Sequence, residues 1–349
     1  MEIDLRRQSL AIPIREAHDV GDARRQAMRA GKAVGFDETA NGRVGIVATE
    51  LAGNLVKHAG GGTLILRVLA AGDTQSPEGF DGTIQGQDVL GLEIMSLDDG
   101  PGMNVQRCME DGFSTAGSPG TGLGAISRQA TSFEIYSVPD KGTVMVARLW
   151  PRTAPRADYD IGAVCLPIAG ERLCGDAWAV RPSSSGLDVV VSDGLGHGPV
   201  AAEASDAALE VFARRPDLAP GPLLETMHAA MRATRGAAVL TGHLDGARNS
   251  LTCTGTGNIA GYIMASPRPR GIVSMNGIVG HQIHKVKVFD YECAPEDVII
   301  LHSDGLSTHW KLDDFPGLAS RSASLIAGMM FKHFKRGKDD ATVVVVRRL

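Results

Sequence analysis

The spacing of apolar residues in the first 150 positions predicts an alternation of helices and strands. One apolar stripe, with residues three or four apart, predicts a helix from an N-cap at Asp37 to His58. Its members are Val44, Val47, Leu51 and Leu55. The three glycines at 60–62 should end this helix, because glycine disfavours helical backbone. The remaining patterns predict strands over 9–14, 63–69, 89–96 and 143–149, a helix over 17–34, and a short helix from about Ala125.

Beyond residue 150 the pattern changes to short β-branched runs separated by Gly-Asp and Asp-Gly turns. These runs predict strands over 187–191, 298–301 and 342–346, with helices near 199–214, 220–234 and 319–334. Residues 151–156 hold two prolines and show no periodicity, which is typical of a linker. A chain of 349 residues is also longer than one hydrophobic core usually supports. We therefore expect an α+β protein with a module over 1–150, a linker over 151–158 and a domain over 159–349.

Composition and charge narrow the class of protein. Apolar residues make up 43% of the chain and charged residues 21%, as in soluble globular proteins. The net charge of -5 gives no basic footprint for nucleic acid, and no apolar run approaches the roughly 20 residues that cross a bilayer. Five cysteines without a C-x-x-C pair fit reduced thiols better than a disulfide framework. These features predict a cytoplasmic protein that binds neither nucleic acid nor membranes.

Three groups of residues in the first module suggest a nucleotide site. Glu50, Asn54 and His58 lie four residues apart and project from one helix face, which on its own also fits a solvated surface. After a predicted strand, the sequence D-D-G-P-G at 98–102 offers glycines that let the backbone approach a ligand and a carboxylate that can accept from an exocyclic amine. The glycine-rich segment 117–124 then leads into a helix, whose N-terminal N–H groups can bind phosphates.

This order of an E-x-x-x-N helix, a D-x-G-x-G loop and a glycine-rich lid resembles the GHKL ATPase and kinase superfamily, and within it the RsbT and RsbW/SpoIIAB anti-sigma kinases. The resemblance implies a Bergerat-type α/β sandwich that binds ATP and Mg²⁺. It makes Glu50 the general base on the attacking hydroxyl, Asn54 the Mg²⁺ ligand and Asp98 the acceptor for the adenine amino group. The other residues that it implies around ATP are His58, Gly100, Gly102, Gly120, Thr121, Gly122, Leu123 and Gly124. A histidine kinase is disfavoured, because the stretch before Glu50 is too short for a helix pair that carries a phosphoacceptor histidine.

Aspartates border short apolar runs at several places in the second domain: Asp176, Asp193, Asp304, Asp339 and Asp340. Each Asp-Gly on its own is usually a turn. Aspartates at the ends of several core strands can converge, however, and converging carboxylates must be neutralised. Hard divalent cations with oxygen ligands do this, and two such ions can activate a water and hold a phosphoryl group. The pattern favours a metal-dependent hydrolase, and the lack of a G-x-S-x-G elbow disfavours a serine nucleophile.

The segments S-D-G-L-G-H-G at 192–198, L-H-S-D-G-L at 301–306 and K-D-D-A-T-V at 338–343 look like the SpoIIE-type branch of the PPM phosphatases, and RsbX-like domains in particular. The resemblance implies a β-sandwich flanked by helices (αββα) that binds two Mn²⁺ or Mg²⁺ ions.

The same resemblance assigns roles to individual residues. It implies that Asp176 and Asp193 bridge the two ions. The other implied ligands are the Gly194 carbonyl, Asp304 and Asp339. For Asp340, a direct metal bond and a supporting contact both stay open. For His197, a role in orienting phosphate or water and a structural role in its turn also stay open.

Together the two resemblances imply a bifunctional regulator of partner switching. The first module would phosphorylate a serine or threonine on a STAS-domain protein of the anti-anti-sigma or stressosome type, and the second would hydrolyse phosphoserine or phosphothreonine on the same protein or a relative. Because opposed activities on one residue would only hydrolyse ATP, we expect different substrates or a gate on one activity. An alternative is a phosphatase whose first module only senses nucleotide or binds a partner. The sequence leaves open whether the chain forms a homodimer.

Overall fold

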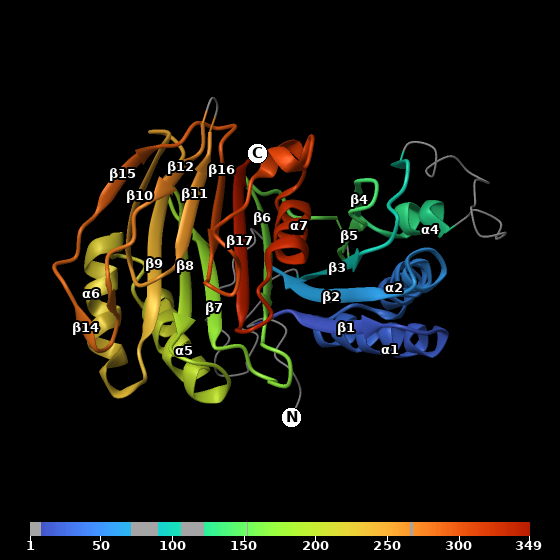
Figure 1. Ribbon diagram of the computed structural model, residues 1–349, viewed down its shortest axis with the longest axis horizontal. Coiled ribbons are helices and arrows are strands. Elements are labelled where there is room, and N and C mark those ends of the chain that lie inside the picture. The colour runs from blue at the N-terminus through green and yellow to red at the C-terminus, as the bar shows by residue number, and fades with distance from the viewer. Residues whose placement is uncertain (1–7, 71–89, 106–121, 152, 266–267) are drawn as a thin grey trace.

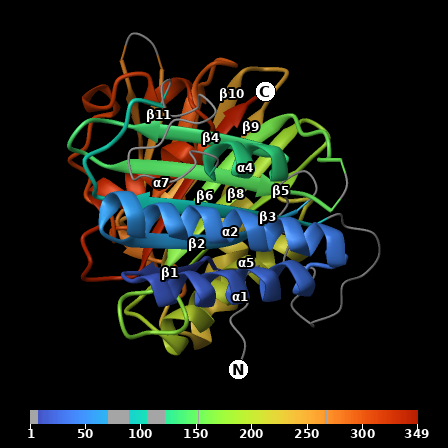
Figure 2. The same cartoon turned by 90° about the vertical axis from the view of Figure 1, so that its right-hand side faces the viewer.

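A computed structural model of the chain describes residues 8–70, 90–105, 122–151, 153–265 and 268–349, which fold into two connected halves (Figure 1). The first half contains an antiparallel sheet with the strand order β1-β2-β3-β5-β4. Its strands are β1 (Leu10–Ile14), β2 (Gly62–Leu69), β3 (Gly91–Asp98), β4 (Ser132–Ser137) and β5 (Thr143–Leu149). The helices that cover one face of this sheet are α1 (Ala17–Ala33), α2 (Glu38–Ala59) and α4 (Gly122–Gln129) (Figure 2).

Helix α2 shows how local sequence sets the boundaries of the element that carries Glu50 and Asn54. The Asp37 side chain accepts a hydrogen bond of 2.7 Å from the Ala40 N–H and caps the helix as predicted. Gly60 ends the helix with a φ of 70°, a left-handed conformation that glycine adopts without strain. Between these ends, the predicted apolar stripe is buried against the sheet.

The second half consists of two five-stranded sheets packed face to face over a shared apolar core. One sheet has the order β15-β10-β9-β8-β7 and the other the order β12-β11-β16-β17-β6. The strands are β6 (Tyr159–Leu166), β7 (Asp176–Pro182), β8 (Gly186–Gly194), β9 (Ala237–Asp245), β10 (Ser250–Thr256), β11 (Ala260–Met264), β12 (Arg270–Ile272), β15 (Phe289–Glu292), β16 (Val298–His302) and β17 (Ala341–Arg348), with a separate small pair of β13 (Gly277–Ile278) and β14 (Gln282–Ile283).

Helices cover the outer faces of both sheets of this half. Helices α5 (Pro199–Arg214) and α6 (Pro220–Ala230) lie on the sheet that contains β8, and α7 (Ala323–Phe334) lies on the sheet that contains β17 (Figure 1). This order of helix, sheet, sheet and helix is the αββα arrangement expected from the sequence.

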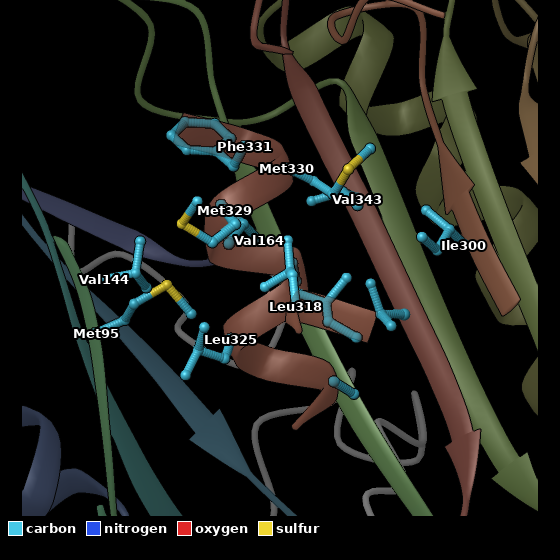
Figure 3. Packing of buried hydrophobic residues seen from close by; sticks show 14 of the residues in the cluster. Met95, Val144, Val164, Ile300, Leu318, Leu325, Met329, Met330, Phe331 and Val343 are labelled. Carbon is cyan, nitrogen blue, oxygen red and sulfur yellow. The ribbon is translucent and has the colours of Figure 1, made fainter. Parts of the chain in front are cut away.

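Helix α7 lies between the two halves and packs on both. Its partners are β6 and β17 of the second half and the remaining face of the first sheet. Figure 3 shows Met95 and Val144 of the first sheet facing Met329 of α7. The helix approaches β6 closely at Gly162, where a Cβ would lie 2.1 Å from the carbonyl carbon of Ala323. One apolar cluster therefore contains residues of both halves.

Buried charged side chains also cross between the halves. Glu93 of β3 accepts hydrogen bonds from Nε of Arg67 at 3.1 Å and Nε of Arg148 at 2.9 Å. The Ser324 hydroxyl of α7 donates to the same carboxylate at 2.5 Å, and Arg148 donates to Asp160 of β6 at 2.9 Å. Burial acts to raise the pKa of Glu93, but the two guanidinium groups outweigh it and hold this pKa at about 2. Glu93 is therefore a charged centre that links the first sheet to α7.

The first described residues contact the second half. The Gln8 side chain accepts from the Cys174 N–H and donates to the Arg172 carbonyl, each at 2.9 Å. The Ser9 N–H donates to the Cys165 carbonyl at 2.9 Å. The first described residues thus lie beside β6 and β7.

The structure confirms most of the predicted elements, with several ends shifted. The short helix predicted from about Ala125 begins at Gly122, and the strand predicted over 89–96 is described over Gly91–Asp98. Strand β5 and helix α5 have the predicted bounds. The helix predicted over 319–334 begins only at Ala323, because Leu318–Ser320 forms a separate 3₁₀ turn and the Ser322 hydroxyl caps α7. The helix predicted over 220–234 ends at Ala230 and continues as a 3₁₀ turn over Met231–Ala233. Among the described residues, none of the helices has the length and apolar character needed to span a membrane.

Candidate nucleotide site and acidic cluster

The first candidate site lies where α2 meets the N-terminus of α4. Glu50 and Asn54 are half-buried and lie one helical turn apart on α2. Gly122, the first residue of α4, lies directly against them: a Cβ on it would be 2.9 Å from Oε2 of Glu50 and 3.7 Å from Oδ1 of Asn54. Any side chain at this position would displace the Glu50 carboxylate. A carboxylate and an amide therefore face a helix N-terminus, an arrangement that suits Mg²⁺ and phosphate groups.

Asp98 ends β3 and holds the loop that follows. Its Oδ1 accepts from the N–H groups of Gly100 at 2.9 Å and Thr143 at 3.2 Å. Burial raises the pKa of Asp98. Gly100 packs on the last turn of α2, where a Cβ would lie 2.9 Å from Cβ of Ala59. The Asp98 loop therefore lies against the helix that also carries Asn54.

The other residues predicted around the nucleotide have varied positions. Gly120 and Thr121 lie outside the described residues. Leu123 and Gly124 are half-buried in the first turn of α4, and His58 is exposed in the last turn of α2. Gly102 lies against the β4–β5 turn, where a Cβ would be 2.5 Å from the Val138 carbonyl oxygen.

The second candidate site begins at the open end of the β7–β8 hairpin. Asp176 and Asp193 are paired directly across this ladder. Beside them, the Gly194 N–H donates to the Gly175 carbonyl at 3.2 Å. Burial raises the pKa of Asp176 well above its usual range.

Asp304 and Asp339 reach the same place from the opposite sheet. Asp304 follows β16, Asp339 precedes β17, and the Asp304 N–H donates to the Asp193 carboxylate. Burial and the nearby carboxylates of Asp176, Asp304 and Asp339 raise the pKa of Asp193 to about 9. The structure therefore brings these four aspartates together at facing ends of the two sheets. We call them the acidic cluster.

Asp340 and His197 have other partners. Oδ1 of Asp340 accepts from the Ile168 N–H at 2.7 Å, and its Oδ2 accepts from the Gly175 N–H at 2.6 Å. Asp340 thus holds the residue that precedes Asp176. His197 lies with its Nδ1 2.9 Å from a carboxylate oxygen of Glu171.

Two residues to which sequence analysis gave no role support the acidic cluster. The Ser303 hydroxyl donates to Oδ2 of Asp176 at 2.7 Å and accepts from the Thr342 N–H at 3.0 Å. The Asn258 side chain donates to Oδ2 of Asp304 at 2.7 Å. Ser303 could have been found from its place beside Asp304, whereas no sequence signal marks Asn258, which follows β10.

The acidic cluster offers only oxygen atoms, the ligands that Mg²⁺ and Mn²⁺ prefer. Its buried like charges also favour binding of a cation. Among the described residues, no three His, Cys, Asp or Glu side chains are arranged to hold one ion together. The carboxylates are therefore spread more widely than the ligands of a single ion, and water or main-chain oxygens would have to complete each site.

Comparison with known proteins gives one matching family model and two relatives. The family model described as Stage II sporulation protein E (SpoIIE) matches residues 183–349. The serine/threonine-protein kinase RsbT of Bacillus subtilis (strain 168) is 31% identical over 135 residues, which is 38% of this chain and 90% of RsbT. The phosphoserine phosphatase RsbX of the same strain is 24% identical over 183 residues, which is 50% of this chain and 88% of RsbX.

One solved structure, with a TM-score above 0.5, has a related fold. A chain from the bacterial stressosome, described as a modular system adapted to control secondary messenger signaling, is 24% identical with a TM-score of 0.51, covering 54% of this chain and 99% of that one. RsbX in complex with magnesium is 20% identical with a TM-score of 0.47, covering 55% of this chain and 96% of that one. The chain belongs to the family of RsbT and carries, in its C-terminal part, a SpoIIE-type phosphatase domain related to RsbX.

Proposed function

We propose that this protein is a bifunctional regulator of partner switching in the cytoplasm, with a kinase module over 1–150, a linker over 151–158 and a phosphatase domain over 159–349. The observation that carries the phosphatase half is the acidic cluster, in which the ends of four strands bring Asp176, Asp304 and Asp339 around Asp193. The relatives RsbT and RsbX, one named as a kinase and the other as a phosphatase, support the combination.

In the phosphatase domain, two Mn²⁺ or Mg²⁺ ions would be held by the acidic cluster and the Gly194 carbonyl. Bound there, such ions supply an acidic water and charge that stabilises a phosphoryl group. The protein supplies positioning. Ser303 holds Asp176, Asn258 holds Asp304, and Asp340 fixes the main chain before Asp176. We assign Asp340 to this supporting role, because both its oxygens already accept from main-chain N–H groups.

In the kinase module, Glu50 would take the proton from the attacking serine or threonine hydroxyl, and Asn54 would hold Mg²⁺. The helix N-terminus at Gly122 would face the phosphates, and Asp98 would accept from the adenine amino group. The close approach of Gly122 to Glu50 and Asn54 supports this assignment. The substrate class that we propose is a STAS-domain protein, in line with the RsbT and stressosome relatives.

A two-part assay tests this function on the full-length chain. With radiolabelled ATP, Mg²⁺ and a STAS-domain protein, the wild type should transfer label and Asn54→Ala should not. With the phosphorylated STAS protein and Mn²⁺, the wild type should release phosphate and Asp193→Ala should not. Phosphate release without any label transfer would favour the alternative, a phosphatase whose first module only senses nucleotide or binds a partner. Retained release in Asp193→Ala would overturn the metal assignment.

A further inference from the structure

A buried lysine of the second half contacts the candidate nucleotide loop of the first half. Lys332 lies in the last turn of α7, and only 5% of its side chain is exposed. Its Nζ donates to Oδ1 of Asp99 at 2.6 Å and to the main-chain carbonyl of Lys141 at 2.8 Å. Because an unpaired buried ammonium is costly, these two contacts should persist in the folded protein.

Both partners of Lys332 belong to segments that hold Asp98. Asp99 is its direct neighbour in the chain, and Lys141 begins the stretch Lys141-Gly142-Thr143 that enters β5. The Thr143 N–H donates to Oδ1 of Asp98. Gly142 is packed so tightly that a Cβ on it would lie 1.9 Å from the Asp98 carbonyl oxygen. One ammonium therefore joins the loop after β3 to the β4–β5 turn, around the carboxylate proposed to bind adenine.

The same contact favours the charged form of Asp99. Its side chain is 93% exposed, yet the hydrogen bond from Lys332 is the main reason that its pKa is lowered. A charge-assisted hydrogen bond is stronger than a neutral one. The contact thus ties the exposed Asp99 side chain to α7.

The position of Lys332 is set by the phosphatase half. Just beyond it, the Phe334 carbonyl accepts from the Ser307 N–H at 2.8 Å, and the Arg336 N–H donates to the Gly305 carbonyl at 2.8 Å. Ser307 and Gly305 belong to the loop that starts with Asp304 of the acidic cluster. The last turn of α7 and the residues just after it are therefore hydrogen-bonded to the loop that starts with Asp304. Through Lys332, the same turn is hydrogen-bonded to the loop that contains Asp98 and Asp99.

We propose that Lys332 is a positioning residue for the nucleotide site, so that the second half of the chain completes the ATP site of the first. Lys332 acts through Asp99 and the Lys141 carbonyl, which keep Asp98 in place for the adenine amino group. This role rests on the proposed function, since that function identifies the ligand as ATP.

The test measures the affinity of the full-length protein for a fluorescent trinitrophenyl-ATP with Mg²⁺. Lys332→Met should weaken binding about 10-fold or more, because it removes a hydrogen bond to a charged group. Lys332→Arg should restore most of the affinity, since guanidinium can reach the same two acceptors. Asp99→Asn should weaken nucleotide binding less than Lys332→Met. The double variant should lose less binding free energy than the sum of the losses in the two single variants. Lys287→Met, at an exposed position before β15, is the control and should bind like the wild type.

The outcomes separate the two claims. If the wild type binds no nucleotide, the proposed kinase module fails. If the wild type binds and Lys332→Met binds equally well, the positioning role fails while the proposed function stands. Thermal unfolding shows whether each variant is folded. If Lys332→Met is unfolded, the test rests on Lys332→Arg and Asp99→Asn. The positioning role is contradicted if Asp99→Asn binds the nucleotide as tightly as the wild type. It is also contradicted if Lys332→Arg binds no more tightly than Asp99→Asn.

Discussion

The hydroxyl of Ser303 donates a 2.7 Å hydrogen bond to Asp176 and thereby joins the two facing sheets of the phosphatase domain at the acidic cluster. Ser303 follows β16 and Asp176 begins β7, so this contact closes the space between the sheets at the end where the aspartates meet. The same hydroxyl accepts from the Thr342 N–H of β17. A single side chain thus sets the position of one carboxylate relative to the strand that follows Asp339 and Asp340.

Removing this hydroxyl should weaken metal binding more than it weakens the fold. In Ser303→Ala, we expect the Mn²⁺ concentration for half-maximal hydrolysis of p-nitrophenyl phosphate to rise roughly 10- to 100-fold, the usual effect of losing a contact that orients a metal ligand. Ser307→Ala is the matched control, because its exposed hydroxyl only accepts from the His309 N–H. An unchanged Mn²⁺ dependence in Ser303→Ala would contradict this role.

Asp193→Asn should separate activity from stability. We expect Mn²⁺-dependent hydrolysis of p-nitrophenyl phosphate to fall by at least about 100-fold, because a ligand and its charge are lost. Without metal at neutral pH, the variant should unfold at a higher temperature than the wild type, by about 2–4 °C for each kcal/mol gained. The raised pKa of Asp193 means that the wild type must take up a proton at this carboxylate on folding, whereas the amide needs none. Asp217→Asn, at an exposed position paired with Arg215, should leave hydrolysis unchanged and shift the unfolding temperature only slightly. A metal-free Asp193→Asn that is less stable than the wild type would argue against a repulsive cluster.

Two substitutions on α2 should affect different steps of label transfer. Glu50→Gln should lower transfer from ATP by roughly 10²- to 10⁴-fold while nucleotide still binds, as expected for loss of a general base. Asn54→Ala should instead weaken the binding of Mg²⁺ and nucleotide. Glu38→Gln, exposed in the first turn of the same helix, is the matched control. Equal transfer by Glu50→Gln and wild type would exclude Glu50 as the base.

The buried charge of Glu93 should make the folding stability of the protein fall at acidic pH. Its pKa is about 2 in the folded protein against 4.5 for an unperturbed glutamate, so folding favours the charged form. The stabilisation is therefore complete above about pH 4.5 and is lost as the pH falls towards 2; it amounts to on the order of 3 kcal/mol.

Urea unfolding between pH 7 and pH 3 measures this effect. Glu93→Gln should be less stable than the wild type at neutral pH, and the difference should shrink as the pH falls below about 4.5. Glu210→Gln removes a surface ion pair with Arg214 and should shift stability by less than about 1 kcal/mol at any pH. A constant difference between Glu93→Gln and the wild type over this range would refute the linkage.

Local signals made much of the fold predictable. The caps at Asp37 and Gly60 and the bounds of β5 and α5 follow from side chains close in sequence. The acidic cluster was predictable in outline, because each aspartate lies at a strand end and the turn signals are strong. The residues that hydrogen-bond to the cluster were not predictable, because the contact of Asn258 with Asp304 depends on how two loops 46 residues apart come together.

The junction between the halves was harder to predict, although part of the signal is visible in hindsight. Residues 323 to 331 of α7 are all buried. A helix whose residues are apolar on all faces is expected to be packed against other elements on all of those faces. The sequence does not say which surface provides the second cover. The pairing of Glu93 with Arg67 and Arg148 likewise depends on the register of β2, β3 and β5, which alternation along one strand does not determine.

The place of α7 in the core has a consequence for the order in which the protein is made. The first sheet is complete once residue 149 has been synthesised, but the helix that covers its second face ends at Phe334. Until that helix leaves the ribosome, an apolar surface that includes Met95 and Val144 lacks the cover that α7 provides. Nascent chains with exposed apolar surface are the ones that aggregate or engage chaperones. The first module should therefore fold productively only after nearly the whole chain has been translated.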